Sequence, residues 1–205
     1  MIKITMRNFN TTNIPSPKLN HFELPHLPLD IEIGCGVGLH PIQYAIKNPE
    51  RFLVAIEHTT EKFKKFERRY EKHNSPSNLL PIHENGISWV THLLPKESVS
   101  RFFFLFPNPN PKPSQQNKRF HAMPFMERVI ECLNPGGTIH FATNEKFYAE
   151  ECLDFMTNIW KLQNIQNKIL DNQSGHIGRT HFERKYLERG QVIYDQIFQK
   201  GDSHE

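Results

Sequence analysis

Three glycines at alternate positions follow a short apolar run in residues 31–38, whose sequence is IEIGCGVG. Because glycine has no Cβ, Gly34, Gly36 and Gly38 allow a ligand to lie against the backbone, and a helix that begins directly after them would direct free N–H groups toward it. Glu57 ends the next apolar run about 20 residues further on, where a carboxylate can bind both hydroxyls of a ribose. These residues predict a site for a ribose-bearing ligand at the edge of a sheet.

The glycine spacing narrows the class of ligand. A dinucleotide-binding G-x-G-x-x-G pattern needs a glycine where Leu39 stands, so a dinucleotide is disfavoured. The alternate-glycine form, with Glu32 on the preceding strand, resembles the first motif of class I S-adenosylmethionine methyltransferases. The alternative is an ordinary strand–turn–helix corner that binds nothing.

A second candidate segment is residues 106–112, with the sequence FPNPNPK, which directly follows a phenylalanine-rich strand predicted over 100–106. Three prolines in five residues hold the backbone stiffly and remove three N–H donors. Ligands of open α/β sheets bind outside the carboxyl ends of the strands, so this segment should face the same crevice as the glycines. It would then present Asn108 and Lys112 in fixed geometry; the alternative is a proline-rich surface turn without a ligand.

Strand-like and helix-like segments alternate along the chain, which is typical of a parallel, doubly wound sheet. We predict an α/β fold: a Rossmann-like, mostly parallel sheet with an antiparallel C-terminal edge hairpin. Residues 1–29 are expected to form an irregular N-terminal arm, and residues 30–200 a single domain. Beyond the first two strands, which lie within 30–57, the expected elements are helices over 59–74, 86–94, 121–133 and 145–161, and strands over 79–83, 100–106, 138–142 and 192–198.

Composition limits the cellular setting. The 205 residues carry a net charge of +3 with neutral histidines, which permits an anionic partner without requiring one. The twelve histidines lack ligand spacing, so no metal site is predicted. Cys35, Cys132 and Cys152 form no C-x-x-C pair and suit a reducing compartment. No stretch approaches the roughly 18 apolar residues of a membrane span, so we predict a cytoplasmic protein without a membrane partner. We expect it to be a monomer or a homodimer.

An ordered set of further motifs extends from about residue 30 to residue 198. The set resembles the bacterial tRNA (guanine-N7)-methyltransferase family. That family has an acidic glycine motif, an acid after the second strand, Asp-Ala after the third, FPDPWPK after the fourth, then KPGG, ATD, TKFE and a final apolar-Tyr/Trp-Asp strand. The corresponding segments here are residues 32–38, 56–57, 84–86, 106–112, 134–137, 142–144, 179–184 and 192–195.

The resemblance implies roles for individual residues. S-adenosylmethionine would be held by Glu32, Gly34, Gly36, Gly38, Glu57 and Asn85. Asn108 would lie beside both the cofactor and the target base, as the catalytic position. The guanine or adjacent RNA of a tRNA partner would be held by Lys112, Asn144, Thr180, His181, Phe182 and Glu183.

Most departures from the family pattern concern charge. Asn85, Asn108 and Asn144 stand where the family has Asp, Asn110 replaces its tryptophan, and its basic run is thinned over 113–119. Guanine N7 needs no base to deprotonate it, but it becomes cationic as the methyl arrives. A carboxylate would stabilise that charge, whereas an amide can only accept a hydrogen bond. We therefore expect a retained cofactor site with slow or redirected transfer.

Other interpretations stay open at this stage. The chain could be a non-catalytic paralogue that binds RNA or a protein, a methyltransferase of a small molecule or protein, or an amino-group methyltransferase with an Asn-Pro loop. The candidates for phosphate contacts are Lys112, Lys118, Arg119, Arg179, Arg184, Lys185 and Arg189, and the alternative for each is a solvated surface charge. The charged run over 61–69 is interpreted as a solvated helix face.

Overall fold

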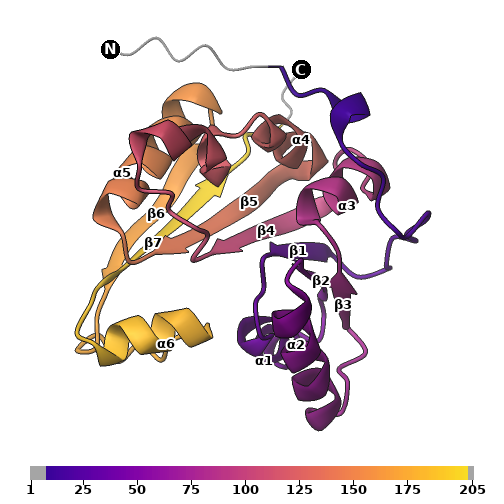
Figure 1. Cartoon of the computed structure of the whole chain (residues 1–205), viewed down its shortest axis with the longest axis horizontal. Helices are drawn as coiled ribbons and strands as arrows, with labels where there is room; N and C mark the ends of the chain where they lie inside the picture. The colour runs from indigo at the N-terminus through magenta and orange to yellow at the C-terminus, as the bar shows by residue number, and fades with distance from the viewer. Residues whose placement is uncertain (1–7, 203–205) are drawn as a thin grey trace.

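The computed structural model describes residues 8–202, and its centre is one seven-stranded sheet in the order β3-β2-β1-β4-β5-β7-β6 (Figure 1). The strands are β1 (Leu29–Ile33), β2 (Phe52–Glu57), β3 (Leu79–His83), β4 (Val99–Leu105), β5 (Leu133–Thr143), β6 (Gln163–Leu170) and β7 (Ile193–Gln199). Strands β1 to β5 run parallel, while β7 pairs antiparallel with both β5 and β6. The predicted fold class is confirmed, including the antiparallel hairpin at the C-terminal edge.

Helices cover both faces of the sheet (Figure 1). One face carries α1 (Leu39–Lys47), α2 (Thr60–Lys72) and α6 (His181–Glu188), and the other carries α3 (Gly86–Leu93), α4 (Phe125–Cys132) and α5 (Lys146–Asp154). Each layer has its own apolar core. Strand β6 and helix α6 are not among the elements expected from the sequence, and both belong to the C-terminal third of the chain.

Strand β4 shows how the sequence positions the site. Successive side chains of a strand point to opposite faces, and this central strand is buried on both. Phe102 and Phe104 therefore enter one core, while Phe103 and Leu105 enter the other. The strand ends at Leu105, so the proline segment begins at the carboxyl edge of the sheet, as predicted.

Two predicted helices have different bounds in the structure. The helix expected over 121–133 begins only at Phe125, after a 3-10 turn at Phe120–Ala122 and Pro124 at the N-cap. The helix expected over 145–161 ends at Asp154 and continues as a π-helix, Phe155–Ile159. Thr157 Oγ1 donates to the Leu153 carbonyl there, which competes with regular helical hydrogen bonds.

The N-terminal segment lies along the α3 and α4 side of the molecule. Among residues 8–28 the regular structure is a 3-10 helix at Thr11–Asn13. Phe22 packs edge-on against Trp89 of α3 with ring centroids 4.9 Å apart, and Phe9 packs against Phe125 of α4. These contacts place the segment away from the glycine loop.

Candidate active site

The glycine loop between β1 and α1 uses its three glycines in two ways. Gly34, Gly36 and Gly38 all have positive φ angles, of 79°, 63° and 76°. A Cβ at Gly38 would lie 2.0 Å from Phe66 Cδ2, so this glycine permits α1 to pack on α2. A Cβ at Gly34 or Gly36 would meet nothing within 4 Å. Those two glycines border open space, which is the arrangement expected of a ligand cradle.

A cavity of about 380 Å³ lies against this loop. Its walls are the loop itself, the start of α1, the end of β4, one side of α2 and the first residues of α6. The volume lies within the range of small-molecule sites, and its position outside the carboxyl ends of β1 and β4 is where α/β sheets bind ligands. Glu32, Gly34, Gly36, Thr180, His181 and Phe182, all predicted site residues, line it.

Two buried carboxylates support the loop from β1 and β2. Glu32 is 2% exposed, lines the cavity, and has Oε2 2.8 Å from Nδ1 of His40. Glu57 accepts hydrogen bonds from the backbone N–H of Gly36 (2.8 Å) and of Thr59 (2.7 Å). Glu57 therefore fixes the glycine loop directly, and each carboxylate oxygen keeps a second lone pair for a ligand hydroxyl.

The proline segment is held by its own asparagines. Phe106 lines the cavity with φ of 56°, an unusual angle for a bulky residue that typically occurs at functional sites. Asn108 Oδ1 accepts from the N–H of Asn110 (3.1 Å), and Asn110 Nδ2 donates to the carbonyls of Asn108 (3.1 Å) and Lys118 (3.2 Å). Asn110 has φ of 44°, which asparagine tolerates better than most residues.

Arg119 binds the backbone of the proline segment, a role that the sequence does not predict. Its side chain is nearly buried, and it donates to the carbonyls of Pro109 (3.1 Å) and Asn110 (3.0 Å) while pairing with Glu151. Burial raises the pKa of Glu151, but bonds from His121 and Gln116 and the charge of Arg119 bring that pKa below its ordinary value. The expectation that Arg119 contacts RNA is wrong, because its guanidinium is used inside the protein.

The start of α6 is fixed by a second buried network. Thr180 caps the helix by accepting from the N–H of Glu183 (3.0 Å). Glu183 is fully buried and accepts from Arg179 Nη2 (2.8 Å), which also bonds Asp195 of β7 (2.6 Å). Burial raises the pKa of Glu183, but the Arg179 contacts lower it below its ordinary value. Arg179 is thus a structural cation, and Arg184 donates to the Gly178 carbonyl, so phosphate binding is not the main use of either.

The remaining predicted residues lie outside the cavity lining. Asn85 is the N-cap of α3, where its Oδ1 accepts from the N–H of Ile87 (2.9 Å). Asn144 Nδ2 donates to Glu145 Oε1 (3.1 Å), and Lys112 and Asn108 are exposed.

Within residues 8–202, no three His, Cys, Asp or Glu side chains form a candidate metal site. No helix in that same range is long and apolar enough to cross a membrane.

Comparison with known proteins identifies the family. Residues 26–196 match a family model described as “Putative methyltransferase”. The tRNA (guanine-N(7)-)-methyltransferase of Acinetobacter baylyi is 33% identical over 181 residues, covering 88% of this chain and 73% of that protein. The enzyme of the same name from Nitrosomonas eutropha is 30% identical over 173 residues, covering 84% of this chain and 76% of that protein.

Solved structures agree on the fold. The 16S rRNA methyltransferase KamB superposes with a TM-score of 0.63 at 18% identity, covering 85% of this chain and 88% of that one. The M. jannaschii TYW2 complex with AdoMet gives a TM-score of 0.51 at 16% identity, covering 86% of this chain and 71% of that one. The open space over Gly34 and Gly36 fits S-adenosylmethionine, because it admits atoms that a Cβ would exclude. The chain therefore belongs to the tRNA (guanine-N7)-methyltransferase family and is an S-adenosylmethionine-dependent methyltransferase.

Proposed function

We propose that this protein transfers a methyl group from S-adenosylmethionine to N7 of a guanine in tRNA, in the cytoplasm. The observation that carries the proposal is the junction of two segments at one cavity. The cradle of Gly34 and Gly36 forms one wall, and Phe106, the first residue of the proline segment, forms another. The names of the relatives supply the substrate class, tRNA guanine.

The cofactor site is built from backbone and buried carboxylates. Gly34 and Gly36 would accept the cofactor against their backbone, while Glu57 would bind ribose hydroxyls with its free lone pairs. Glu32 and Asn85 complete the proposed set. When bound, S-adenosylmethionine supplies an electrophilic methyl group on a sulfonium.

The contribution of the protein to transfer is chiefly orientation. N7 already carries its lone pair, so a base is not required, and holding the guanine in line supplies most of the acceleration. Phe182 is 42% exposed at the cavity and offers a ring on which a purine can stack. Lys112, Asn144 and the segment 180–183 would hold the guanine or its neighbours, with Glu183 acting by fixing the start of α6.

Asn108 limits the electrostatic part of catalysis. Its Oδ1 already accepts from the Asn110 N–H, and an amide supplies no full negative charge to the cationic product. With Asn108 in this position, we expect slower methyl transfer than with a carboxylate at residue 108. Its exposed Nδ2 keeps donor capacity for the base.

Methyl transfer to unmodified tRNA tests the proposal. The protein is incubated with tritiated S-adenosylmethionine and tRNA from cells that lack N7 methylation, and the digested nucleosides are identified by mass spectrometry. We expect labelled 7-methylguanosine. Label in another nucleoside would assign a different target atom, and tRNA binding without transfer and without cofactor binding by calorimetry would favour the RNA-binding paralogue instead.

A further inference from the structure

Helix α2 segregates its charges to two sides. Residues 60–72 contain six basic and three acidic side chains. Lys62, Lys65, Arg69 and Lys72 recur at intervals of three and four residues, so they form one stripe along the helix. Two of the acids, Glu67 and Glu71, lie on the opposite side, beside Phe63 and Tyr70 in a separate surface hollow. The run is therefore more than the uniformly solvated face predicted from the sequence.

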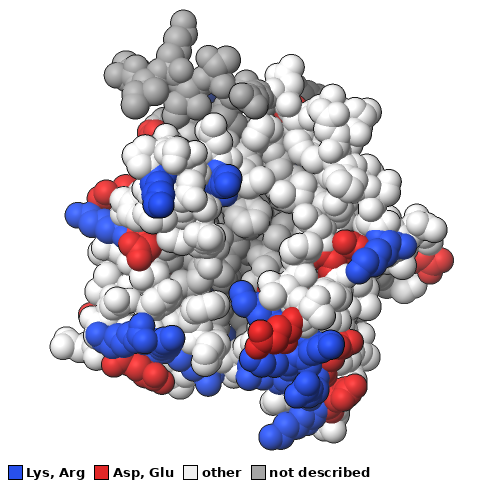
Figure 2. Space-filling view, in the orientation of Figure 1, with Lys and Arg blue, Asp and Glu red and all other residues white. Residues whose placement is uncertain are grey.

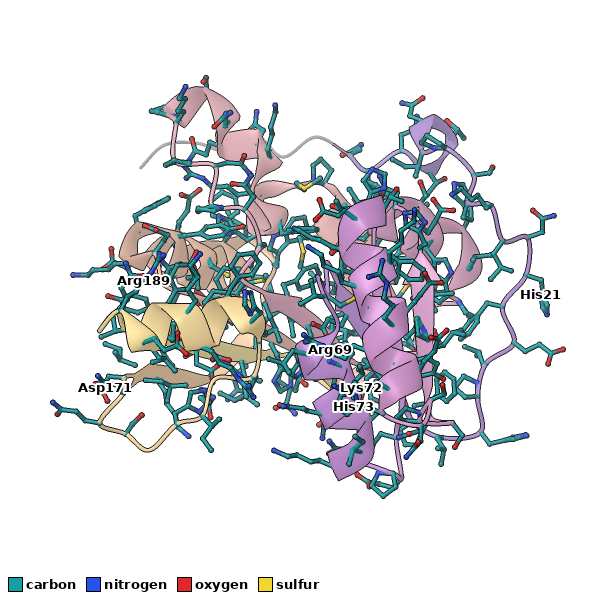
Figure 3. The ribbon with its side chains drawn as sticks, turned by 60° about the horizontal axis from the view of Figure 1, so that its bottom comes forward. His21, Arg69, Lys72, His73, Asp171 and Arg189 are labelled. Atoms are coloured by element: carbon teal, nitrogen blue, oxygen red, sulfur yellow. The ribbon has the colours of Figure 1, made fainter. Side chains whose placement is uncertain are left out.

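This basic stripe (Lys62, Lys65, Arg69 and Lys72) begins at the candidate active site. Lys62 and Lys65 line the cavity, and Lys62 Nζ lies 5.9 Å from the ring centroid of Phe182 on α6. Figure 2 shows lysine and arginine side chains gathered over α2, with a second group over α6. Figure 3 places Arg69 and Lys72 at the far end of α2, so the stripe leads away from the cavity mouth.

The three lysines of the stripe are open to solvent, so they can bind an anion. Lys62, Lys65 and Lys72 are exposed, and Arg69 is partly buried. Lys65 pairs with Glu61 at 2.7 Å and keeps 57% of its side-chain exposure. Lys62, Arg69 and Lys72 make no ion pair with any residue in the described part of the chain. By contrast, Arg119 pairs with the partly buried Glu151, and Arg179 pairs with the buried Glu183.

We propose that the basic stripe of α2 binds the phosphate backbone of the RNA next to the guanine in the cavity. The inference rests on the proposed function for its substrate, and it adds where that substrate lies. Every nucleotide of the backbone carries an anionic phosphate, and lysines at a helical repeat can contact several phosphates in succession. Phe182, at the start of α6 and close to Lys62 of the stripe, would stack on the base while α2 holds the strand.

The salt dependence of tRNA binding tests this surface. Lys65→Gln, Arg69→Gln and Lys72→Gln are made singly and together, since glutamine is polar, uncharged and a good helix former. Removing each phosphate-binding cation should lower the slope of log K against log salt by roughly 0.7 to 1, and the triple variant should bind on the order of tenfold more weakly. Lys64→Gln is the matched control on the acidic side of α2, where tRNA affinity should not change.

Two further readouts separate this inference from the proposed function. Wild-type protein that methylates tRNA, together with a triple variant of unchanged affinity and slope, would overturn the surface while the activity stands. Loss of S-adenosylmethionine affinity with an unchanged salt slope would assign the stripe to the cofactor and also overturn it. Failure of the wild type both to bind and to methylate tRNA would overturn both proposals.

Discussion

At the scale of single residues, the exchange of Asp for Asn in the proline segment matters most. Asn108 and Asn110 bond each other's backbone and so shape the turn that places residue 108. An aspartate at 108 could accept the same N–H from residue 110 and would add a negative charge near the base. The asparagine thus preserves the geometry while removing the charge.

Asn108→Asp should raise the rate of N7 methyl transfer by up to about a hundredfold, because the restored carboxylate stabilises the cationic product. The measurement is kcat with saturating tRNA and cofactor. Asn117→Asp places the same charge on an exposed residue of the neighbouring 3-10 helix, Pro113–Lys118, and should leave kcat unchanged. A rate that stays equal or falls in Asn108→Asp would contradict this role.

Arg119 is the residue that keeps the proline segment in place. Arg119→Lys retains the charge but cannot reach two carbonyls and Glu151 at once, so kcat should fall on the order of tenfold to a hundredfold through misplacement of the base. The affinity for S-adenosylmethionine, measured by calorimetry, should stay within about twofold, since Arg119 does not line the cavity. Equal losses of kcat and cofactor affinity would instead point to a general structural defect.

The sequence pointed to residues of the glycine loop and the proline segment, but it assigned Arg119, which holds the proline segment, to RNA instead. Prolines remove N–H groups and leave carbonyls that need donors, so a basic residue shortly after the segment was a usable signal for Arg119. Nothing in the sequence distinguished its use from that of Lys118, because the difference is burial alone.

At the scale of elements, the glycine loop and α6 each form part of the cavity wall. The loop was recognisable because alternate glycines have few other uses. Helix α6 also had a signature, since Thr180 and Glu183 form a capping box. Strand β6 had none: it lies at the sheet edge with mostly exposed, polar residues, so an apolar alternation is missing.

Two glycine variants separate binding from packing within the loop. Gly36→Ala should weaken S-adenosylmethionine binding at least tenfold with a modest loss of stability of about 1–2 kcal/mol from the positive φ. Gly38→Ala should lose more stability, since a clash with Phe66 adds about 1–3 kcal/mol to the same backbone cost. Calorimetry and urea unfolding measure the two effects, and the reverse ranking would disprove the division between cradle and packing.

At the scale of the whole molecule, the mostly parallel sheet with helices on both faces followed from the alternation of strand-like and helix-like segments. The bounds of the helices near Pro124 and Phe155 did not, because they depend on local hydrogen bonds and packing. The positions of the charges also emerged only from the fold: Arg119 and Arg179, two of the cations assigned to RNA, pair with carboxylates of the protein, and the helix assigned to solvent borders the cavity.

Acid should destabilise the folded protein. Burial, together with Arg101 and Arg179, lowers the pKa of His140 to about 3. The stability that neutral His140 contributes is complete above about pH 6.5, the pKa of histidine in the unfolded chain. It is lost as pH falls toward 3, at up to about 1.4 kcal/mol per pH unit. The lowered pKa of Glu183 acts in the same direction below its own ordinary value.

Urea unfolding at pH 7, 6 and 5 measures this dependence. The free energy of unfolding should fall across that range, and the free energy of unfolding of the His140→Asn variant should fall less steeply between pH 6 and 5. The same slope in both proteins would show that another group controls the acid sensitivity.

The proposed activity requires that N7 be the atom methylated. Two tRNA transcripts test this directly, one with guanosine and one in which 7-deazaguanosine replaces it, so that a carbon stands at the N7 position. We predict transfer of the labelled methyl group to the guanosine transcript and none to the deaza transcript. Equal labelling of both transcripts, or labelling of neither while the same tRNA is methylated by a known N7 enzyme, would contradict the proposed activity.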